Sequence, residues 1–463
     1  MKKITKLISI ILSLLIVFSC ISVSIASAVG EVYTYSTSGV YATITSCQTL
    51  ARGTVEIPST YTKTVNGEEV QYTVNRIGNG AFSGCTDITE IVVPSSVIKV
   101  GDRAFENCAS LEKVTFKGSE CEIGKSAFFG CSALESVSLP TALKAIADET
   151  FNDCTSLASI TIPSTVSLIG TEAFKMCRSL TQIDIPASVK TIKKNAFLGC
   201  ASVGAFNVDN GNTVYSDING VLYGPFFDAT PHINSLTDDK ALIQYPNALS
   251  ATSFTVPSDI DRIDDYAFGE NIKLTKVTLP EGLKTIEPYA FYMCKNLSEI
   301  NIPSSVTTIG SMAFGRCDSL KLITIPASVT QFESAFYASG LEKVILEDGV
   351  KAISVRAFEN CYVLKKITIP DSVTGIYSGA FYNCTSLGET EIPSSVTEIG
   401  VRAFDGCTSL SIVTEEGSAA YEYAVNNGIT IGNNAEELSF FQKIINAIVG
   451  FFEMIIEFFA SLF

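Results

Sequence analysis

Cysteine is the residue type in this sequence with the most chemical potential. The 463 residues include 14 cysteines, a single histidine, His232, and no tryptophan. So many cysteines in an exported protein could form a disulfide framework or a metal cage. A catalytic triad or a His-rich zinc site would have only His232 to draw on, and no carboxylate or thiol is arranged around it in the local sequence. We therefore interpret His232 as an ordinary loop residue.

The spacing of the cysteines argues against both disulfides and metal binding. Eleven of them occupy one phase of a repeat, three residues after a recurring phenylalanine. Residues stacked in this way have parallel Cβ directions, which do not suit disulfide geometry. We predict a structural ladder of buried thiols that act as small apolar side chains. Asn271 and Ser339 stand at the same phase in other repeats, which indicates that the position requires a small residue, whereas Cys47 and Cys121 lie outside it. The ladder comprises Cys85, Cys108, Cys131, Cys154, Cys177, Cys200, Cys294, Cys317, Cys361, Cys384 and Cys407.

Oxygen ligands gather in one other place, the stretch 209–219. Asp209, Asn210 and Asn212 lie there with Asp217, which suggests calcium, but the rest of an EF-hand loop is missing. Turns use the same residue types, and we predict a turn. We expect no catalytic residue, no metal and no cofactor. Acid–base chemistry would require residues that break the repeat, and only the insertion at 206–250 has room for them.

The repeat itself predicts the fold. Phenylalanines preceded by Ala or Thr recur every 22 or 23 residues, with one wider interval, and the unit at 169–189 shows the pattern I-G, A-F, C, S-L, I-P, S-V. A fixed period of this length indicates stacked coils, because one such unit cannot bury its apolar face alone. The recurring residues are Phe82, Phe105, Phe128, Phe151, Phe174, Phe197, Phe268, Phe291, Phe314, Phe336, Phe358, Phe381 and Phe404.

Each unit predicts one short strand with alternating sides. In the segment 180–186, Leu180, Ile183 and Ile185 face inward, and Pro186 ends the strand because it lacks an N–H for the ladder. Gly170 permits the backbone bend of the adjoining turn. We predict a β-rich solenoid of about 13 rungs with a parallel strand ladder.

These units resemble those of the BspA-type leucine-rich repeat family of bacterial surface and secreted proteins. The resemblance covers residues 76–417. It includes the interruption, where FNVDNGNTVYSDINGVLY resembles a variant rung of that family. We expect variant rungs and a loop within 198–267, with the loop itself at 224–240. The resemblance implies an interaction or adhesion module whose partner is a protein or a glycan.

An open stack of rungs needs caps at both ends. Residues 29–75 are rich in Thr, Val and Tyr and predict strands that cover the first rung. Residues 418–434 predict a C-terminal cap whose helix ends at Gly428. The last segment, 435–463, predicts an apolar amphipathic helix with few polar positions. Such a helix suits a membrane surface or self-association, and docking on the solenoid is the alternative.

The N-terminus and the overall charge indicate the compartment and the partner class. Three lysines precede an apolar run at 7–18 that is too short for a comfortable membrane span, and an A-x-A site lies at 26–28. Residues 1–28 therefore predict a signal peptide. The protein is then secreted, and one hypothesis is that it is retained at the cell surface. Alternatively, Cys20 is a lipoprotein cysteine. The net charge of −16 argues against a nucleic-acid partner.

Strand positions that point away from the core are the candidate binding residues. Repetition aligns them in columns across a continuous face. The candidates are Glu90, Lys113, Thr115, Gln182, Asp184, Lys276, Glu299, Asn301, Lys343, Lys366, Glu389 and Glu391. Few aromatic residues fall in these columns, so no hot spot stands out. The predicted function is a non-enzymatic, secreted or surface-exposed interaction module. The alternative is an envelope scaffold held by 435–463.

Overall fold

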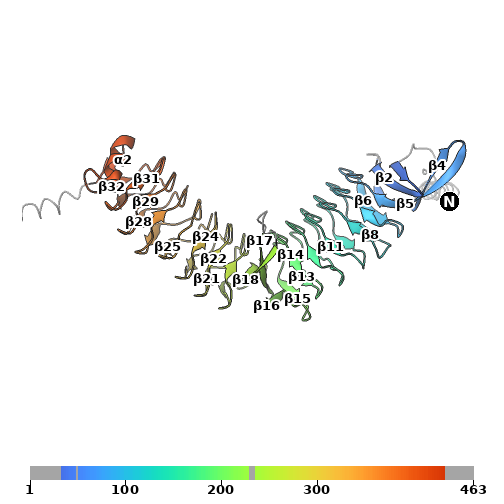
Figure 1. Ribbon diagram of the computed structural model, residues 1–463, viewed down its shortest axis with the longest axis horizontal. Coiled ribbons are helices and arrows are strands. Elements are labelled where there is room, and N and C mark those ends of the chain that lie inside the picture. Colours follow the sequence, from blue (N-terminus) through green and yellow to red (C-terminus); the bar gives the residue numbers. More distant parts are fainter. Residues whose placement is uncertain (1–32, 48–50, 229–234, 433–463) are drawn as a thin grey trace, which may run out of the picture. The chain divides into compact units, whose positions relative to one another are not determined.

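The computed structural model describes residues 33–47, 51–228 and 235–432 (Figure 1). Contacts divide the chain into two compact units, residues 1–177 and 178–463. The predicted signal peptide, His232 and the segment 435–463 lie outside the described residues. Both units are β-solenoids, with about 15 turns in all, two more than the Phe pattern predicts.

Each rung contributes up to two short strands, and equivalent strands of successive rungs pair in parallel. The longer strands β6, β8 and β10 are in register one period apart, so that Glu90 pairs with Lys113 and Lys113 with Ser136. A strand of two residues lies elsewhere in most rungs and forms a second ladder. In the first unit the strands are β1 Tyr33–Ser38, β2 Tyr41–Cys47, β3 Gly53–Glu56, β4 Thr60–Val65, β5 Glu68–Ile77, β6 Ile88–Val93, β7 Lys99–Val100, β8 Lys113–Phe116, β9 Glu122–Ile123, β10 Ser136–Ser138, β11 Ala145–Ile146 and β12 Leu168–Ile169.

The second unit repeats the same scheme and, before its last strand, includes the one helix that the described part of the chain contains. Its longer strands again pair one period apart, as β25, β26 and β28 do. Its elements are β13 Gln182–Ile185, β14 Thr191–Ile192, β15 Ala205–Val208, β16 Ser216–Ile218, β17 Val221–Asp228, β18 Ser235–Gln244, β19 Ser253–Thr255, β20 Arg262–Ile263, β21 Lys276–Thr278, β22 Thr285–Ile286, β23 Glu299–Ile300, β24 Thr308–Ile309, β25 Leu322–Ile325, β26 Lys343–Leu346, β27 Ala352–Ile353, β28 Lys366–Thr368, β29 Gly375–Ile376, β30 Glu389–Glu391, β31 Glu398–Ile399, β32 Ser411–Val413, α2 Ala419–Asn427 and β33 Thr430–Ile431.

The recurring phenylalanines form the centre of each stack. Phe105 and Phe128 lie with ring centroids 5.3 Å apart and ring planes 4° from parallel, and Phe291 and Phe314 repeat this at 5.2 Å and 2°. All four rings are fully buried. Burying one such side chain contributes about 2 kcal/mol, so this column is a principal source of cohesion between rungs.

The turn around each phenylalanine has an unusual backbone. Residues two before and two after the ring adopt left-handed conformations, as Arg103 (φ 55°) and Asn107 (φ 57°) do around Phe105. The amides of Arg103, Phe105 and Asn107 then donate to carbonyls of the next rung at 2.7–2.8 Å. The glycine of the I-G pattern is required for a different reason. A Cβ on Gly310 would lie 2.3 Å from the backbone nitrogen of Pro288 in the preceding rung.

The interruption differs from the predicted loop at 224–240. Strands β17 and β18 pair antiparallel, with Tyr223 opposite Leu242, and β16 pairs antiparallel with β17. The prediction of a loop was wrong because both arms carry strand-forming residues whose long-range pairing is invisible in a local pattern. Strand β18 then pairs in parallel with β20, which restores the solenoid register.

Strands of the segment 33–77 and helix α2 lie at the two ends of the described repeats. In the first unit, β3 pairs in parallel with β6 and β5 with β7, so strands of the N-terminal segment extend both ladders. At the other end, Ser418 caps α2 by accepting from the amide of Tyr421 at 3.1 Å, and Gly428 ends it with φ 66°. No helix in the described ranges combines the length and the apolar character that a membrane span requires.

Candidate functional site

The predicted binding columns lie on the outward side of the longer strands, which we call the exposed strand face of each unit. Of the twelve candidate residues, Glu90 and Thr115 are half-buried and the other ten are exposed. In the first unit the register brings Glu90, Lys113 and Ser136 into one row. The repeat period therefore places these three side chains next to one another on successive rungs.

Much of this face is internally paired. The Lys113 ammonium lies 2.9 Å from the Glu90 carboxylate, and Lys276 forms an ion pair with Glu299. Asn207 donates to Asp184 at 2.8 Å. Exposed pairs of this kind contribute at most about 1 kcal/mol each, so a partner can displace them at small cost. They keep most of the face close to neutral.

One part of the face carries unpaired positive charge. Strands β25, β26 and β28 place Leu322, Lys343 and Lys366 directly side by side. All three are exposed, and neither Lys343 nor Lys366 forms an ion pair with a described residue. Like charges directly opposite each other destabilise a sheet. This row, which we call the lysine row, therefore works against folding and is the best candidate for a binding role on the exposed strand face.

Ten of the eleven phased cysteines are buried and Cys407 is partly buried, and most of them have a specific partner. The Sγ of Cys317 lies 3.1 Å from the backbone carbonyl of Phe291 in the preceding rung, and Cys294 contacts Phe268 in the same way. Burial raises the pKa of Cys294 to about 12. A thiol held protonated in this way is a poor nucleophile and a poor metal ligand. The same contact, at 3.1–3.2 Å, is made by Cys108, Cys131, Cys154, Cys177, Cys361, Cys384 and Cys407.

The two natural exceptions at this phase show what it requires. Asn271 accepts the amides of Lys273 and Leu274 at 2.9 and 2.8 Å, and the Ser339 hydroxyl lies 3.3 Å from the Cys361 sulfur. Small size is therefore only part of the requirement. Nine of the phased cysteines and both exceptions also make a polar contact inside the stack, which was not evident from the sequence.

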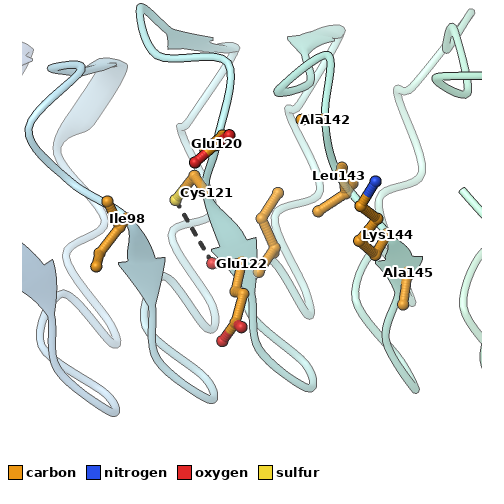
Figure 2. A pocket seen from close by; sticks show the side chains of 9 residues that line it. Ile98, Glu120, Cys121, Glu122, Ala142, Leu143, Lys144 and Ala145 are labelled. Carbon is orange, nitrogen blue, oxygen red and sulfur yellow. Dashed lines mark hydrogen bonds between the residues drawn. The ribbon is translucent and has the colours of Figure 1, made fainter. Parts of the chain in front are cut away.

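A hollow of about 690 Å³ opens beside Cys121 in the first unit (Figure 2). Its lining comes from three successive rungs and includes Ile98, Cys121 and Leu143. The Cys121 sulfur points to the backbone carbonyl of Glu122 at 3.5 Å. Because burial raises the pKa of Cys121 to about 12, the hollow offers apolar contact and no activated nucleophile.

An aromatic cluster that sequence reasoning missed lies in the second unit. Tyr266 and Tyr289 stack with centroids 4.6 Å apart and planes 1° from parallel, and Tyr292 meets both edge-on. All three are half-buried. The signal was present, because tyrosine precedes the phenylalanine by two residues in two successive rungs. The cluster lies on the turns, whereas the search for aromatic residues covered the strands.

Comparisons with known proteins agree with this architecture. The chain is similar to a leucine-rich cell surface protein from Faecalibacterium prausnitzii, with 28% identity over 89% of this chain and 100% of that one, and a TM-score of 0.56. A leucine-rich repeat protein from Eubacterium ventriosum is also 28% identical, over 80% and 91%, with a TM-score of 0.61. The pneumococcal vaccine antigen PcpA shares the fold at 20% identity, over 87% and 95%, with a TM-score of 0.54.

Among curated proteins, none matches the chain. The family model described as BspA type leucine rich repeat region matches residues 75–204, 244–339 and 332–422, in six copies. These ranges cover well over half of the chain and contain the Phe turns, the cysteine phase and both ladders. The chain therefore belongs to the BspA-type leucine-rich repeat family.

Proposed function

We propose that this protein is a secreted or surface-displayed adhesion module that binds a partner protein through the exposed strand face of its second unit. The lysine row carries the proposal, because Lys343 and Lys366 are exposed, adjacent and unpaired in a chain of net charge −16. Two ammonium groups with the apolar Leu322 at one end of the row suit an acidic partner surface that carries an apolar contact beside it. Leucine-rich repeat proteins are typically non-enzymatic, and a binding role accords with the family.

Export is part of the same proposal. The basic and apolar composition of residues 1–28 supports a signal peptide, and the similar protein from Faecalibacterium prausnitzii is a cell surface protein. Mass spectrometry of the protein recovered from medium and cell surface tests this. We expect a mature chain that begins near residue 29. A chain that keeps residues 1–28 inside the cell would contradict export.

The binding role can be tested with the mature chain on a panel of purified extracellular matrix proteins and a glycan array. We expect binding to at least one protein, with a loss of about tenfold or more for the double variant Lys343→Gln, Lys366→Gln, since each 1.4 kcal/mol changes affinity tenfold. The matched control changes two exposed lysines elsewhere in the unit, Lys295→Gln and Lys351→Gln. Binding to no protein, or equal loss in both double variants, would overturn the proposal.

The second candidate function is an envelope scaffold held in place by residues 435–463. Its support is the composition of that segment, which is mostly large and apolar with one lysine and two glutamates from residue 439 onward. Deleting 439–463 tests it. Increased release into the medium or a smaller oligomer supports retention or self-association, and no change in either excludes both.

A further inference from the structure

A second recess, distinct from the exposed strand face, lies in the unit 178–463. It has a volume of about 390 Å³, and its lining comes from the hairpin β17–β18, from the rungs of β20 and β22 and from Lys194. Its ionisable lining residues are Lys194, Arg262, Asp228, Asp264, Asp265 and Glu287. Four carboxylates against two cations give it a formal charge of −2. We call it the acidic recess.

Two successive rungs place acidic residues in the acidic recess. Asp264 and Glu287 occupy the position that is glycine in the I-G pattern of other rungs, such as Gly310. Other side chains also occur at this position, as Lys193 and Tyr377 show. Among the rungs with the recurring phenylalanine, however, only these two carry a carboxylate four residues before it, and both line the acidic recess.

Both cations of the acidic recess are already engaged. Arg262 donates to Asp239 at 2.5 Å and to Glu287 at 2.7 Å, and its guanidinium lies 4.9 Å from the centre of the Phe226 ring. Lys194 forms an ion pair with one carboxylate oxygen of Asp265.

One carboxylate oxygen remains unsatisfied. The Asp265 side chain is only 5% exposed, and its Oδ1 has no hydrogen-bond partner among the described residues. A buried acceptor left unpaired costs about 1–3 kcal/mol. Burial also raises the pKa of Asp265, and it raises that of Glu287 despite Arg262. The acidic recess thus contains a buried carboxylate with an unsatisfied oxygen, and a bound cation would stabilise its charged form.

We propose that the acidic recess binds the side-chain ammonium or guanidinium of a basic residue on a partner polypeptide, with the Asp265 carboxylate as its acceptor. Phe226 and Phe227 line the same space and supply an apolar wall for the methylene stem of lysine or arginine. The volume lies within the range of small-ligand sites. A bare metal ion fits less well, because no group of three potential ligands with metal-binding geometry is found among the described residues.

This inference goes beyond the proposed function, because the acidic recess and the lysine row carry opposite charge and use different residues. An experiment can therefore contradict the proposal for one site and leave the proposal for the other unaffected. Loss of binding to a matrix protein in the lysine-row variants does not bear on the acidic recess, and the peptide experiment below does not involve Lys343 or Lys366.

The test is calorimetric titration of the mature chain with capped pentapeptides that have one central residue flanked by glycines. We expect the lysine or the arginine peptide to bind at least about tenfold more tightly than peptides whose central residue is norleucine or acetyl-lysine. Norleucine keeps the apolar stem without charge, and acetyl-lysine keeps the length. Equal affinity for charged and neutral peptides, or no binding at millimolar concentration, would overturn the proposal.

Variants then locate the site. Asp265→Asn preserves shape and removes the charge, and we expect it to weaken peptide binding about tenfold. Glu281→Gln is the matched control, because Glu281 is exposed, lies in the same unit and does not line the acidic recess. Circular dichroism establishes whether each variant is folded. If Asp265→Asn unfolds the chain, the comparison of charged and neutral peptides on the unaltered protein still decides the outcome. Equal weakening by both variants would refute the location.

Discussion

The contacts of the cysteine ladder predict how substitutions of Cys317 change the free energy of unfolding. Its side chain is fully buried, its sulfur lies 3.1 Å from the carbonyl oxygen of Phe291, and that carbonyl also accepts the amide of Cys294 at 3.1 Å. Removing the sulfur therefore leaves the carbonyl with one partner. For Cys317→Ala we expect a loss of roughly 0.5–1 kcal/mol for the weak S–H donor and about 1 kcal/mol for lost burial and a small void.

Serine at the same position separates two explanations of the ladder. If the position requires a donor, Cys317→Ser costs about 1 kcal/mol and is the milder change, since a hydroxyl can bond to the same carbonyl. If the position requires only a small apolar group, serine is the worse change because it buries a hydroxyl. In the native rung with Ser339, the hydroxyl lies 3.3 Å from the Cys361 sulfur, so that rung does not by itself decide between the two explanations.

The assay is urea unfolding of the mature chain followed by far-ultraviolet circular dichroism. Variants are compared where their m-values agree, because long repeat arrays can lose two-state behaviour. Amide hydrogen exchange on the rungs of Cys294 and Cys317 provides a local measurement of the same effect. An alanine variant that is more stable than the serine variant would refute the donor explanation.

Three further predictions concern other parts of the stack and are measured by the same unfolding assay. Gly310→Ala destabilises the protein by about 2 kcal/mol or more, because its Cβ would lie 2.3 Å from a backbone atom. The control Gly388→Ala, whose Cβ would have its nearest contact at 3.7 Å, changes the free energy of unfolding by no more than about 0.5 kcal/mol. Equal effects of the two variants would refute the close-approach argument. Ser418→Ala removes the N-cap of α2 and costs about 1 kcal/mol; an unchanged midpoint would show that the cap is dispensable. Burial, and to a smaller extent the charge of Asp265, raises the pKa of Asp264. Between the ordinary pKa and the raised one, the folded chain therefore binds more protons than the unfolded chain. The contribution of Asp264 to stability falls as the pH rises through this window. Asp264→Asn should therefore stabilise the protein by about 1 kcal/mol at neutral pH, with the gain shrinking toward pH 4, and a constant or opposite difference would contradict the raised pKa.

The repeat made most of the fold predictable. A residue and its counterpart one period later are neighbours in space, so spacing alone places Lys343 beside Lys366 and stacks Phe291 on Phe314. The same rule could not find the hairpin β17–β18, since its pairing is antiparallel and occurs once. A strand that appears once has no period to reveal it.

The acidic recess was hidden for a related reason. Lys194 and Asp265 meet although several rungs' length of sequence separates them, and the hairpin shares in the same lining. Periodicity predicts contacts between equivalent positions, whereas this contact joins unlike ones. The carboxylates at the I-G position of two successive rungs, Asp264 and Glu287, were nonetheless visible in the sequence. Because other rungs also lack the glycine, the sequence alone could not show that these two residues line a recess.

The stacked architecture also explains how an unfavourable group can persist. Each rung contacts only its neighbours, so the free energy of the stack is close to a sum over rungs and interfaces. The cost of an unpaired Asp265 oxygen or of two facing lysines is therefore borne locally, while the columns of Phe rings and buried thiols on either side remain intact. A globular core would transmit the same strain to all its elements. A binding site in this protein can thus destabilise its own rungs without unfolding the rest of the stack. The lysine row and the acidic recess can be tolerated for this reason.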